Sequence, residues 1–413
     1  MRILHTADWH LGRTMRGKSR ASEFEAVLGE LAEIAKAERV DVMLVCGDIW
    51  DTASPSPESD RLLNEALREL IGLGVQVVLI AGNHDSARKL EALGRLSDLL
   101  GVHTQSHVKR PDEGGVITLT AGDETARIAA IPWVQEGRVI DAAEVLGLEH
   151  EQHQSYAEQT ARIYRSMAAP FDEPAAAKTI NIMAGHLFVD GAVLSDIDGS
   201  ERLLHIGMGY GIAPAALPST PQYIALGHIH QPQEILTTTA PAAYAGSLLQ
   251  LDFGERDQEK VVRIIDVQPG RPIEQRAIAL TKGRRLTELR GTLDDVIAAA
   301  DGVADAFTRV VLNVDRPEPG LAARVREAIP LAVDVRLDYP RAVDEAPEPE
   351  LARLSPQELF DRYYRAQHGV APDLALLALF TELLDESAEA PLLPDAAAPD
   401  AAPAPTAPVE AAS

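Results

Sequence analysis

Five apolar segments of this chain end in side chains that commonly bind metal ions, and this repeated pattern constrains the fold more than any other feature. In an α/β sheet, ligands bind outside the carboxyl ends of the strands, so five such strand ends can meet at one crevice. Glycines 47, 82, 185 and 227 each precede a ligand-type residue and permit the close backbone paths of strand-to-loop turns. The segments are LHTADWH at 4–10, VMLVCGDIWD at 42–51, VVLIAGNHD at 77–85, INIMAGH at 180–186 and YIALGHIH at 223–230.

The candidate ligands in these segments are carboxylates, one amide and imidazoles, without sulfur. Such a set suits Mn²⁺, Fe²⁺ or Zn²⁺ and argues against Ca²⁺ or a cysteine-rich structural zinc site. Two divalent ions about 3.5–4 Å apart need roughly this many ligands. Asp48, from the middle of the set, is the best candidate for a carboxylate that bridges both ions. We therefore predict a site for two divalent metal ions, with Mn²⁺ favoured over Mg²⁺, Fe²⁺ or Zn²⁺, to which six or seven of the following residues contribute: Asp8, His10, Asp48, Asn83, His186, His228 and His230.

Each motif alone also has a structural interpretation. An isolated Asp-x-His is weak, Gly-Asn-His-Asp is compatible with an asparagine-containing turn, and Gly-His-x-His is compatible with the end of an alternating strand. The five together, in this order and each after a predicted strand, argue against coincidence. His5 lies within the first strand and is expected to be a core histidine, and Trp9 is expected to pack beside the site.

The alternation of short β-rich runs with amphipathic stretches predicts a layered α/β domain over residues 1–270. Helices are expected at 22–39, 58–73 and 155–167. Strands are expected at 2–7, 41–46, 76–81, 127–131, 179–184, 223–226, 243–251 and 260–267.

The pattern changes after residue 270 and predicts three further parts. Residues 271–342 form a small α/β unit of the βαβαβ type, with strands expected at 276–280, 286–289, 308–314 and 332–337. Residues 351–387 form a pair of short helices, the first opening with a capping box from Ser355 to Glu358. Residues 388–413 consist mainly of alanine, proline and acidic residues, a composition typical of a disordered tail.

Composition leaves the partner of this chain open. The net charge of −25 argues against a nucleic-acid ligand, although bound cations would reverse the local field of an acidic site. One loop is basic without an acidic residue, and it is either a solvated loop or a phosphate contact: Arg13, Arg16, Lys18 and Arg20. We expect no signal peptide, no membrane segment and a cytoplasmic location. Cys46, the only cysteine, can form no intrachain disulfide.

The set D-x-H, G-D, G-N-H-D, G-H and G-H-x-H resembles the calcineurin-like metallophosphoesterase superfamily. Longer stretches, HTADWHLG, GDIWDTASPSP, AGNHDS, GAVLSDIDGSER, YIALGHIH and AGSLLQLDFGE, resemble the SbcD family, the nuclease subunits of bacterial SbcCD exonucleases. This resemblance covers residues 1 to about 385. It implies a calcineurin-like α/β/β/α sandwich, a small capping domain that helps to select DNA, and a C-terminal helix pair.

The resemblance also implies roles for individual residues. One ion would be held by Asp8, His10, Asp48 and His230, and the other by Asp48, Asn83, His186 and His228. His84 would be catalytic, stabilising charge at the scissile phosphate or protonating the leaving oxygen, with support from Asp85. Archaeal relatives place a histidine near Asp51, and no role is assigned to this aspartate.

The implied activity is a metal-dependent DNA exonuclease and endonuclease acting at duplex ends and hairpins in DNA repair, recombination and replication. The implied assembly is a homodimer within a heterotetramer that contains an SbcC-type ATPase. The C-terminal helix pair would grip the coiled-coil base of this ATPase through an apolar face formed by Leu359, Phe360, Tyr363, Tyr364, Leu379, Phe380 and Leu383.

Three other functions use the same ligands. A small-substrate phosphodiesterase, for example one acting on cyclic nucleotides, would not need the second domain or the helix pair. The protein-phosphatase signature G-D-x-V-D-R-G is absent, because Gly47-Asp48 is followed by Ile-Trp-Asp-Thr. A non-catalytic subunit that binds DNA ends would be expected to have lost ligands, and none is missing.

Overall fold

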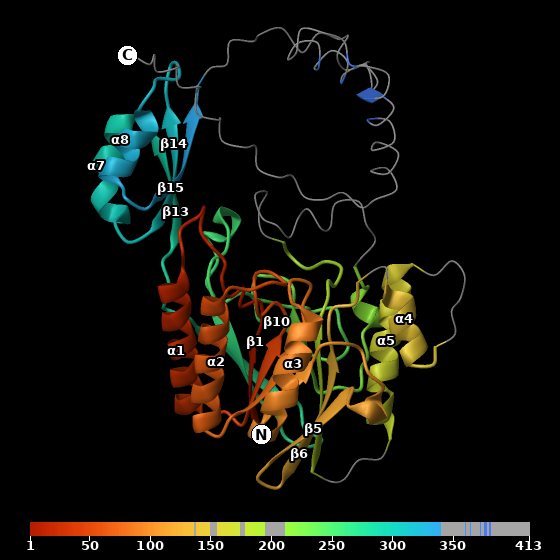
Figure 1. Cartoon of the computed structure of the whole chain (residues 1–413). Helices are drawn as coiled ribbons and strands as arrows, with labels where there is room; N and C mark the ends of the chain where they lie inside the picture. Colours follow the sequence, from red (N-terminus) through yellow and green to blue (C-terminus); the bar gives the residue numbers. More distant parts are fainter. Residues whose placement is uncertain are drawn as a thin grey trace, which may run out of the picture. The chain divides into compact units, whose positions relative to one another are not determined.

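The computed structural model describes residues 1–135, 138–148, 155–173, 178–194 and 211–339, and beyond them the single residues Phe360, Tyr364, Pro372, Leu376, Leu377 and Phe380. Residues 1–339 form one unit, which contains two six-stranded sheets and a separate three-stranded sheet (Figure 1). The predicted α/β class is therefore confirmed.

The first sheet consists of β1 (Arg2–Thr6), β2 (Val42–Cys46), β3 (Gln76–Ile80), β4 (Val102–Gln105), β11 (Val261–Asp266) and β12 (Glu274–Ala279). Its order is β12-β11-β1-β2-β3-β4, in which β1 to β4 are parallel and β11 and β12 are antiparallel to their neighbours. The parallel strands alternate with α1 (Ala21–Glu38), α2 (Pro57–Gly72) and α3 (Ala87–Ser97). All of β2 is buried, because both faces of the sheet are covered.

The second sheet consists of β5 (Val116–Ala121), β6 (Glu124–Ile131), β7 (Thr179–His186), β8 (Tyr223–Gly227), β9 (Gln233–Glu234) and β10 (Ala242–Tyr244). Its order is β5-β6-β7-β8-β10-β9, and β6, β7, β8 and β10 are parallel. Two helices, α4 (Val139–Val145) and α5 (Tyr156–Ala168), lie between β6 and β7 in the chain. The side chain of Ser155 caps α5 and forms a capping box with Glu158, as expected for a helix that begins here.

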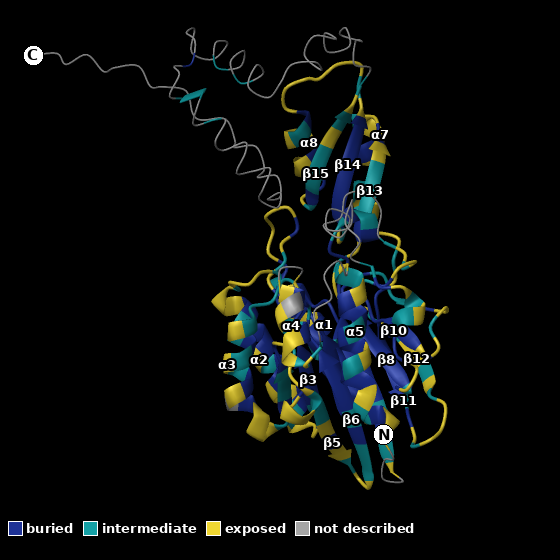
Figure 2. Ribbon diagram, turned by 90° about the vertical axis from the view of Figure 1, so that its right-hand side faces the viewer, coloured by how far each residue is buried: buried dark blue, intermediate teal, exposed yellow. Residues whose placement is uncertain are grey.

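Three apolar clusters define the layers of this domain. One lies between α1–α3 and the first sheet, with Leu28, Leu63 and Val45 among its members. Another fills the space between the sheets, where Leu44 of β2 and Ile182 of β7 both belong to it. The last packs α5 on the outer face of the second sheet. The order of layers is thus α/β/β/α, with buried strands between helices whose outer faces are exposed (Figure 2).

The small unit consists of β13 (Leu286–Gly291), α7 (Leu293–Ala298), β14 (Phe307–Asn313), α8 (Leu321–Ala328) and β15 (Ala332–Asp338). Its strands are parallel, in the order β13-β14-β15, and its two helices pack on them through one apolar cluster. This is the predicted βαβαβ pattern. We call residues 286–338 the three-stranded unit.

Two strand predictions need correction. The strand expected at 276–280 is β12, which pairs with β11 in the first large sheet, so the three-stranded unit begins only at Leu286. The strand expected at 243–251 ends at Tyr244, because the backbone turns at Gly246, which has a φ of +80°. The α-carbon of Gly246 also passes close to the His230 carbonyl oxygen, and a Cβ at this position would lie 2.7 Å from that oxygen. The strands β4, β5 and β9 were not predicted.

The predicted C-terminal helix pair at 351–387, its capping box and the tail at 388–413 lie almost wholly outside the described residues, as do Leu359, Tyr363, Leu379 and Leu383. Of the predicted apolar face, Phe360 stacks on Phe380 with ring centroids 4.1 Å apart, and Tyr364 lies 6.0 Å from Phe360.

Candidate metal centre

The predicted ligands meet at the carboxyl ends of parallel strands from both large sheets. Asp8, Asp48 and Asn83 follow β1, β2 and β3 of the first sheet. His186 is the last residue of β7, and His228 comes directly after β8, in the second sheet. Because these strands are parallel within each sheet and the sheets face each other, their ends form one edge, and the structure brings all seven predicted side chains together there.

The backbone at this edge is left-handed at several ligand positions. Asp8, His10, Asp48 and His228 have φ values of 51°, 48°, 50° and 105°. Residues other than glycine rarely adopt this conformation, which costs free energy and persists only where the surroundings enforce it. At Gly47, with a φ of +89°, a Cβ would lie 2.1 Å from Nδ1 of His186. The chain therefore accepts backbone strain where it turns side chains into the crevice.

One group of side chains gathers around the amide oxygen of Asn83. Its Oδ1 lies 2.9 Å from Nε2 of His186 and 3.0 Å from Nδ1 of His228. The Nδ1 of His186 donates to the Cys46 carbonyl oxygen at 2.8 Å, so a neutral His186 presents only a lone pair at Nε2. With the amide oxygen of Asn83 on this side, two electron-rich atoms face each other at 2.9 Å, and a proton or a cation between them would stabilise the contact.

A second group has the same character. The Nε2 atoms of His10 and His230 are 3.1 Å apart, and a carboxylate oxygen of Asp8 completes a cluster whose ligand atoms all lie within 4.8 Å of one another. The Nδ1 of His230 donates to Oε1 of Glu255 at 2.9 Å, which leaves the lone pair at Nε2 for the cluster.

Asp48 lies between the two groups. Its Oδ2 is 3.6 Å from Nε2 of His10 and 3.5 Å from Nε2 of His186, while its Oδ1 accepts the backbone N–H of His84 at 2.9 Å. A carboxylate in this position can reach a cation in either group, which is the property expected of the bridging ligand.

The pKa values of these groups reflect burial and mutual charge. Burial raises the pKa of Asp8 to about 7, and nearby Asp48 adds to this shift. Burial also disfavours ionised Asp48, yet the imidazoles of His186, His10 and His84 hold its pKa well below the usual value. Burial opposes protonation of His186, but Asp48 and Asp8 raise its pKa to about 9. A divalent cation would supply the positive charge that these carboxylates now obtain from a protonated histidine.

The two groups therefore fit two divalent cations. Each contains inward-facing lone pairs of nitrogen and oxygen, and His186 and His230 are each held through the second ring nitrogen by a backbone or carboxylate acceptor. None of the ligand side chains contains sulfur, which agrees with Mn²⁺, Fe²⁺, Mg²⁺ or Zn²⁺ as the occupant.

His84 lies at the rim of the centre, half buried, with its ring edge-on to that of His10 at 4.8 Å. Its Nδ1 donates to the backbone carbonyl of Asp51 at 2.8 Å. Asp85, expected to support His84, instead accepts backbone N–H groups of Ile49, Trp50 and Gly82. Burial raises the pKa of Asp85 to about 6, and Asp48 contributes to this shift. Asp85 thus supports His84 only indirectly, by bracing the loops that carry Asp48 and Asn83.

Sequence reasoning missed several residues that contact the ligands. Asp51, which received no role, has Oδ1 3.3 Å from Nδ1 of His10 and 3.4 Å from the Arg13 guanidinium. The ring of Trp133 stacks on His228 with centroids 4.9 Å apart. Glu255 accepts from His230, and burial works against its ionisation, but Lys260 and His230 hold its pKa well below the usual range. Asp51 and Glu255 end the quoted stretches VMLVCGDIWD and AGSLLQLDFGE, but these stretches assign them no role, and Trp133 belongs to no quoted motif.

Two expectations about neighbouring residues are confirmed. His5 is fully buried between the sheets, with Nδ1 3.0 Å from the Tyr223 hydroxyl and Nε2 3.1 Å from the Leu226 carbonyl, and burial lowers its pKa to about 3. Trp9 is also fully buried, and its indole N–H donates to Thr6.

The basic loop after His10 was predicted to be either a solvated loop or a phosphate contact, and neither interpretation fits Arg20. Arg20 is 1% exposed, pairs with Glu23 at 2.8 Å and donates to the Gln250 carbonyl, so it cannot contact DNA. Lys18 donates to the carbonyl of Pro330, and Arg16 lies 3.9 Å from Asp334, both in the three-stranded unit. Arg16 and Lys18 remain exposed at the surface.

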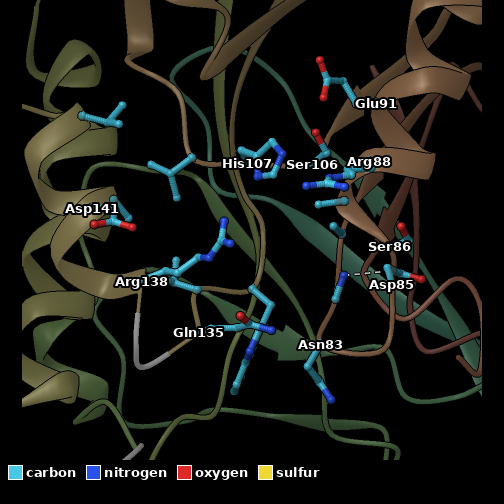
Figure 3. A pocket seen from close by; sticks show the side chains of 18 residues that line it. Asn83, Asp85, Ser86, Arg88, Glu91, Ser106, His107, Gln135, Arg138 and Asp141 are labelled. Carbon is cyan, nitrogen blue, oxygen red and sulfur yellow. Dashed lines mark hydrogen bonds between the residues drawn. The ribbon is translucent and has the colours of Figure 1, made fainter. Parts of the chain in front are cut away.

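A groove opens beside Asn83 and Trp133, with a cavity volume of about 720 Å³. It lies between the start of α3, the loop after β4 and the start of α4. Figure 3 shows Arg88 and Arg138 extending into this space from opposite sides, with His107 near Arg88. Both arginines are exposed. In the described part of the chain, no helix has the length and apolar character needed to cross a bilayer.

Comparison with known proteins agrees with this geometry. Residues 1–232 match the family described as calcineurin-like phosphoesterase, and residues 282–368 match the family described as type 5 capsule protein repressor C-terminal domain. The chain is 31% identical to the D subunit of nuclease SbcCD from Bacillus subtilis (strain 168), over 93% of this chain and 97% of that protein.

Two further relatives carry the same description. The D subunit of nuclease SbcCD from Rhodobacter capsulatus is 32% identical, over 87% of this chain and 93% of the relative. That of Escherichia coli (strain K12) is 28% identical, over 88% and 92% respectively. The chain therefore belongs to the calcineurin-like phosphoesterase family and, within it, to the family of nuclease SbcCD D subunits.

Proposed function

We propose that this protein is a metal-dependent nuclease that hydrolyses phosphodiester bonds at DNA duplex ends and hairpins, as the nuclease subunit of an SbcCD-type repair complex. The observation that carries the proposal is the convergence of seven ligand side chains in two groups that share Asp48, with His84 at the rim. The proposal assigns Asp8, His10, Asp48 and His230 to one ion and Asp48, Asn83, His186 and His228 to the other, with Mn²⁺ as the preferred occupant.

Two bound cations would act as Lewis acids on the phosphoryl oxygens of the substrate and favour attack by water at neutral pH. His84 would act from the rim. Because its Nδ1 is fixed by the Asp51 carbonyl, its Nε2 is the atom available to hold a proton for the leaving oxygen. Asp85 would keep the Asp48 and Asn83 loops at the spacing that both groups require.

The variant His84→Gln tests this assignment. We expect the metal content measured by elemental analysis to match the wild type, while cleavage of end-labelled duplex and hairpin DNA with Mn²⁺ falls by roughly 10²–10⁴-fold. His103→Gln is the control, because His103 pairs with Asp98 away from the centre and should keep full activity. Normal cleavage by His84→Gln would remove His84 from the mechanism.

The substrate strand would leave the metal centre through the groove beside Asn83. Arg88 and Arg138 provide cations for the backbone phosphates, and the half-buried ring of Trp133 forms part of the wall. The double variant Arg88→Ala/Arg138→Ala should raise KM for duplex DNA and leave the cleavage of a small phosphodiester unchanged. Arg271→Ala is the matched control, since this exposed arginine follows β11 at the opposite end of the sheet.

The same assays separate the alternative functions. A small-substrate phosphodiesterase would hydrolyse a cyclic nucleotide better than DNA, and a non-catalytic DNA-end-binding subunit would bind DNA ends without cutting them. We also propose a homodimer within a heterotetramer, a cytoplasmic location and an ATPase partner bound through the C-terminal segment. The stacking of Phe360 on Phe380 supports the last point, because it joins the two predicted helices through aromatic side chains that remain partly exposed.

A further inference from the structure

Glu255 lies in a short 3₁₀ turn, η6 (Phe253–Glu255), and is 2% exposed. Both of its carboxylate oxygens are used. Oε1 accepts from Nδ1 of His230 at 2.9 Å. Oε2 accepts from Lys260 Nζ at 2.7 Å and from the backbone N–H of Leu251 at 3.0 Å, and the Ser247 hydroxyl, which donates to the Leu249 carbonyl, lies 3.5 Å away. A buried carboxylate with this many donors is held in a single orientation.

Lys260 gives Glu255 its countercharge and also contacts the loop that carries His230. Its side chain is 6% exposed, and its ammonium donates to the backbone carbonyl of His230 at 2.9 Å and to the Gln258 side chain at 2.8 Å. All three protons of the ammonium group therefore have acceptors. Lys260 thus joins the backbone of His230 to the carboxylate that accepts from the side chain of His230.

This arrangement selects one form of the His230 ring. An ionised carboxylate can only accept, so Nδ1 of His230 carries a proton, and in the neutral ring Nε2 then carries the lone pair. Nε2 is the atom that faces Nε2 of His10 at 3.1 Å. Without Glu255, the proton could move to Nε2, and His230 would no longer offer a lone pair to the cluster with Asp8 and His10.

The turn that carries Glu255 is fixed from its other side by the three-stranded unit. Phe253 is fully buried, and the guanidinium of Arg309, in β14, lies 4.4 Å from the centre of its ring. Phe253 also belongs to an apolar cluster with Met15, Leu286 and Phe307. The position of Glu255 thus depends on packing between the three-stranded unit, which contributes Leu286 and Phe307, and the preceding part of the chain, which contributes Met15 and Phe253.

We propose that Glu255, paired with Lys260, is a positioning residue that fixes the tautomer and orientation of His230 and so sets the affinity of the Asp8–His10–His230 group for its divalent cation. The inference rests on the proposed metal centre. It adds a residue outside the predicted ligand set and a connection from the ligand His230 to the three-stranded unit.

The test is a calorimetric titration of the full chain with Mn²⁺ alone. We expect wild type to bind two ions. Glu255→Ala should bind one of them roughly 10–100-fold more weakly, because loss of an outer carboxylate typically weakens a site by this factor. Glu255→Gln should lose less Mn²⁺ affinity than Glu255→Ala, since the glutamine amide oxygen can still accept from Nδ1 of His230.

The matched control is Glu23→Gln, which alters another buried ion pair, with Arg20 at 2.8 Å, that does not touch a ligand. This variant should lose stability and keep both Mn²⁺ affinities. A general loss of stability therefore cannot explain a selective effect of Glu255→Ala, and circular dichroism verifies that each variant is folded.

A second measurement is made on the wild type itself. In ¹⁵N-histidine spectra of the metal-free protein, with the His230 signals assigned by their loss in His230→Asn, we expect the Nδ1–H form. The inference is overturned by an Nε2–H form in wild type or by unchanged Mn²⁺ affinities in Glu255→Ala. Wild type that binds two Mn²⁺ ions but cleaves no DNA would contradict the proposed function and leave the inference about Glu255 intact.

Discussion

Replacing Gly82 by alanine should damage the metal centre without removing a ligand. A Cβ at position 82 would lie 2.1 Å from Oδ1 and 2.3 Å from the backbone nitrogen of Asp48, whereas real Cβ contacts essentially never fall below 3.0 Å. Relief of the closest contact therefore needs a movement of 3.0 − 2.1 = 0.9 Å. Metal–ligand distances tolerate only about 0.2 Å, so the bridging position proposed for Asp48 cannot survive this movement.

We expect Gly82→Ala to weaken Mn²⁺ binding by at least about tenfold, by analogy with the loss of a ligand-orienting contact. Overpacking should also lower the free energy of unfolding by about 1–3 kcal/mol. Titration calorimetry with Mn²⁺ and urea unfolding of the metal-free protein measure the two effects separately.

The control is Gly29→Ala in α1, where a Cβ would meet nothing within 4 Å. This substitution should raise helix stability by about 0.5–1 kcal/mol and leave Mn²⁺ binding unchanged. Two Mn²⁺ ions bound by Gly82→Ala with wild-type affinity would refute the reasoning, because Asp48 could then move without consequence for either group.

Three further predictions concern Asp48 as the proposed bridging ligand, the buried His5 and the C-terminal segment. Asp48→Ala should lose metal in elemental analysis, and full occupancy would contradict the bridging role. The pKa of His5 is lowered to about 3, so stability that is present above pH 6.5 is lost as the pH falls toward 3. Between pH 7 and 5, the wild type should lose about 2 kcal/mol of unfolding free energy more than His5→Gln. If urea unfolding gave the same pH dependence of the unfolding free energy for both proteins, this prediction would be contradicted. Deletion of residues 345–413 should abolish co-purification with the ATPase subunit, and retained binding would argue against the anchor.

The convergence of the candidate ligands could be predicted from the sequence because each follows an apolar strand and belongs to a short motif. The positions of Asp8, Asp48 and His186 could be predicted without knowing which residues surround them, since the carboxyl ends of parallel strands lie at one edge of a sheet whatever the details of packing. The layered fold followed from the same alternation of strands and helices.

The residues that position the ligands could not be found in this way. Glu255 lies in a short 3₁₀ turn at the end of the stretch AGSLLQLDFGE, but its proposed role depends on Lys260 and His230, which approach it only in three dimensions. Arg20 was mispredicted for the same reason: a charged residue in a basic loop resembles a surface residue until Glu23 and the Gln250 carbonyl enclose it. The end of β10 was also missed, because the close approach of Gly246 to the His230 carbonyl is a tertiary contact.

The division of the ligands between two sheets has a consequence for how the protein acquires its ions during synthesis. The ribosome releases Asp8, Asp48 and Asn83 early, but His186, His228 and His230 follow only after about 100 further residues, and Glu255 later still. A growing chain that has completed only the first parallel strands therefore holds three of the four residues proposed for one ion (Asp8, His10 and Asp48) and two of the four proposed for the other (Asp48 and Asn83). Metal binding should therefore coincide with the late docking of the second sheet. The ions would stabilise the folded domain rather than promote the early steps of its folding.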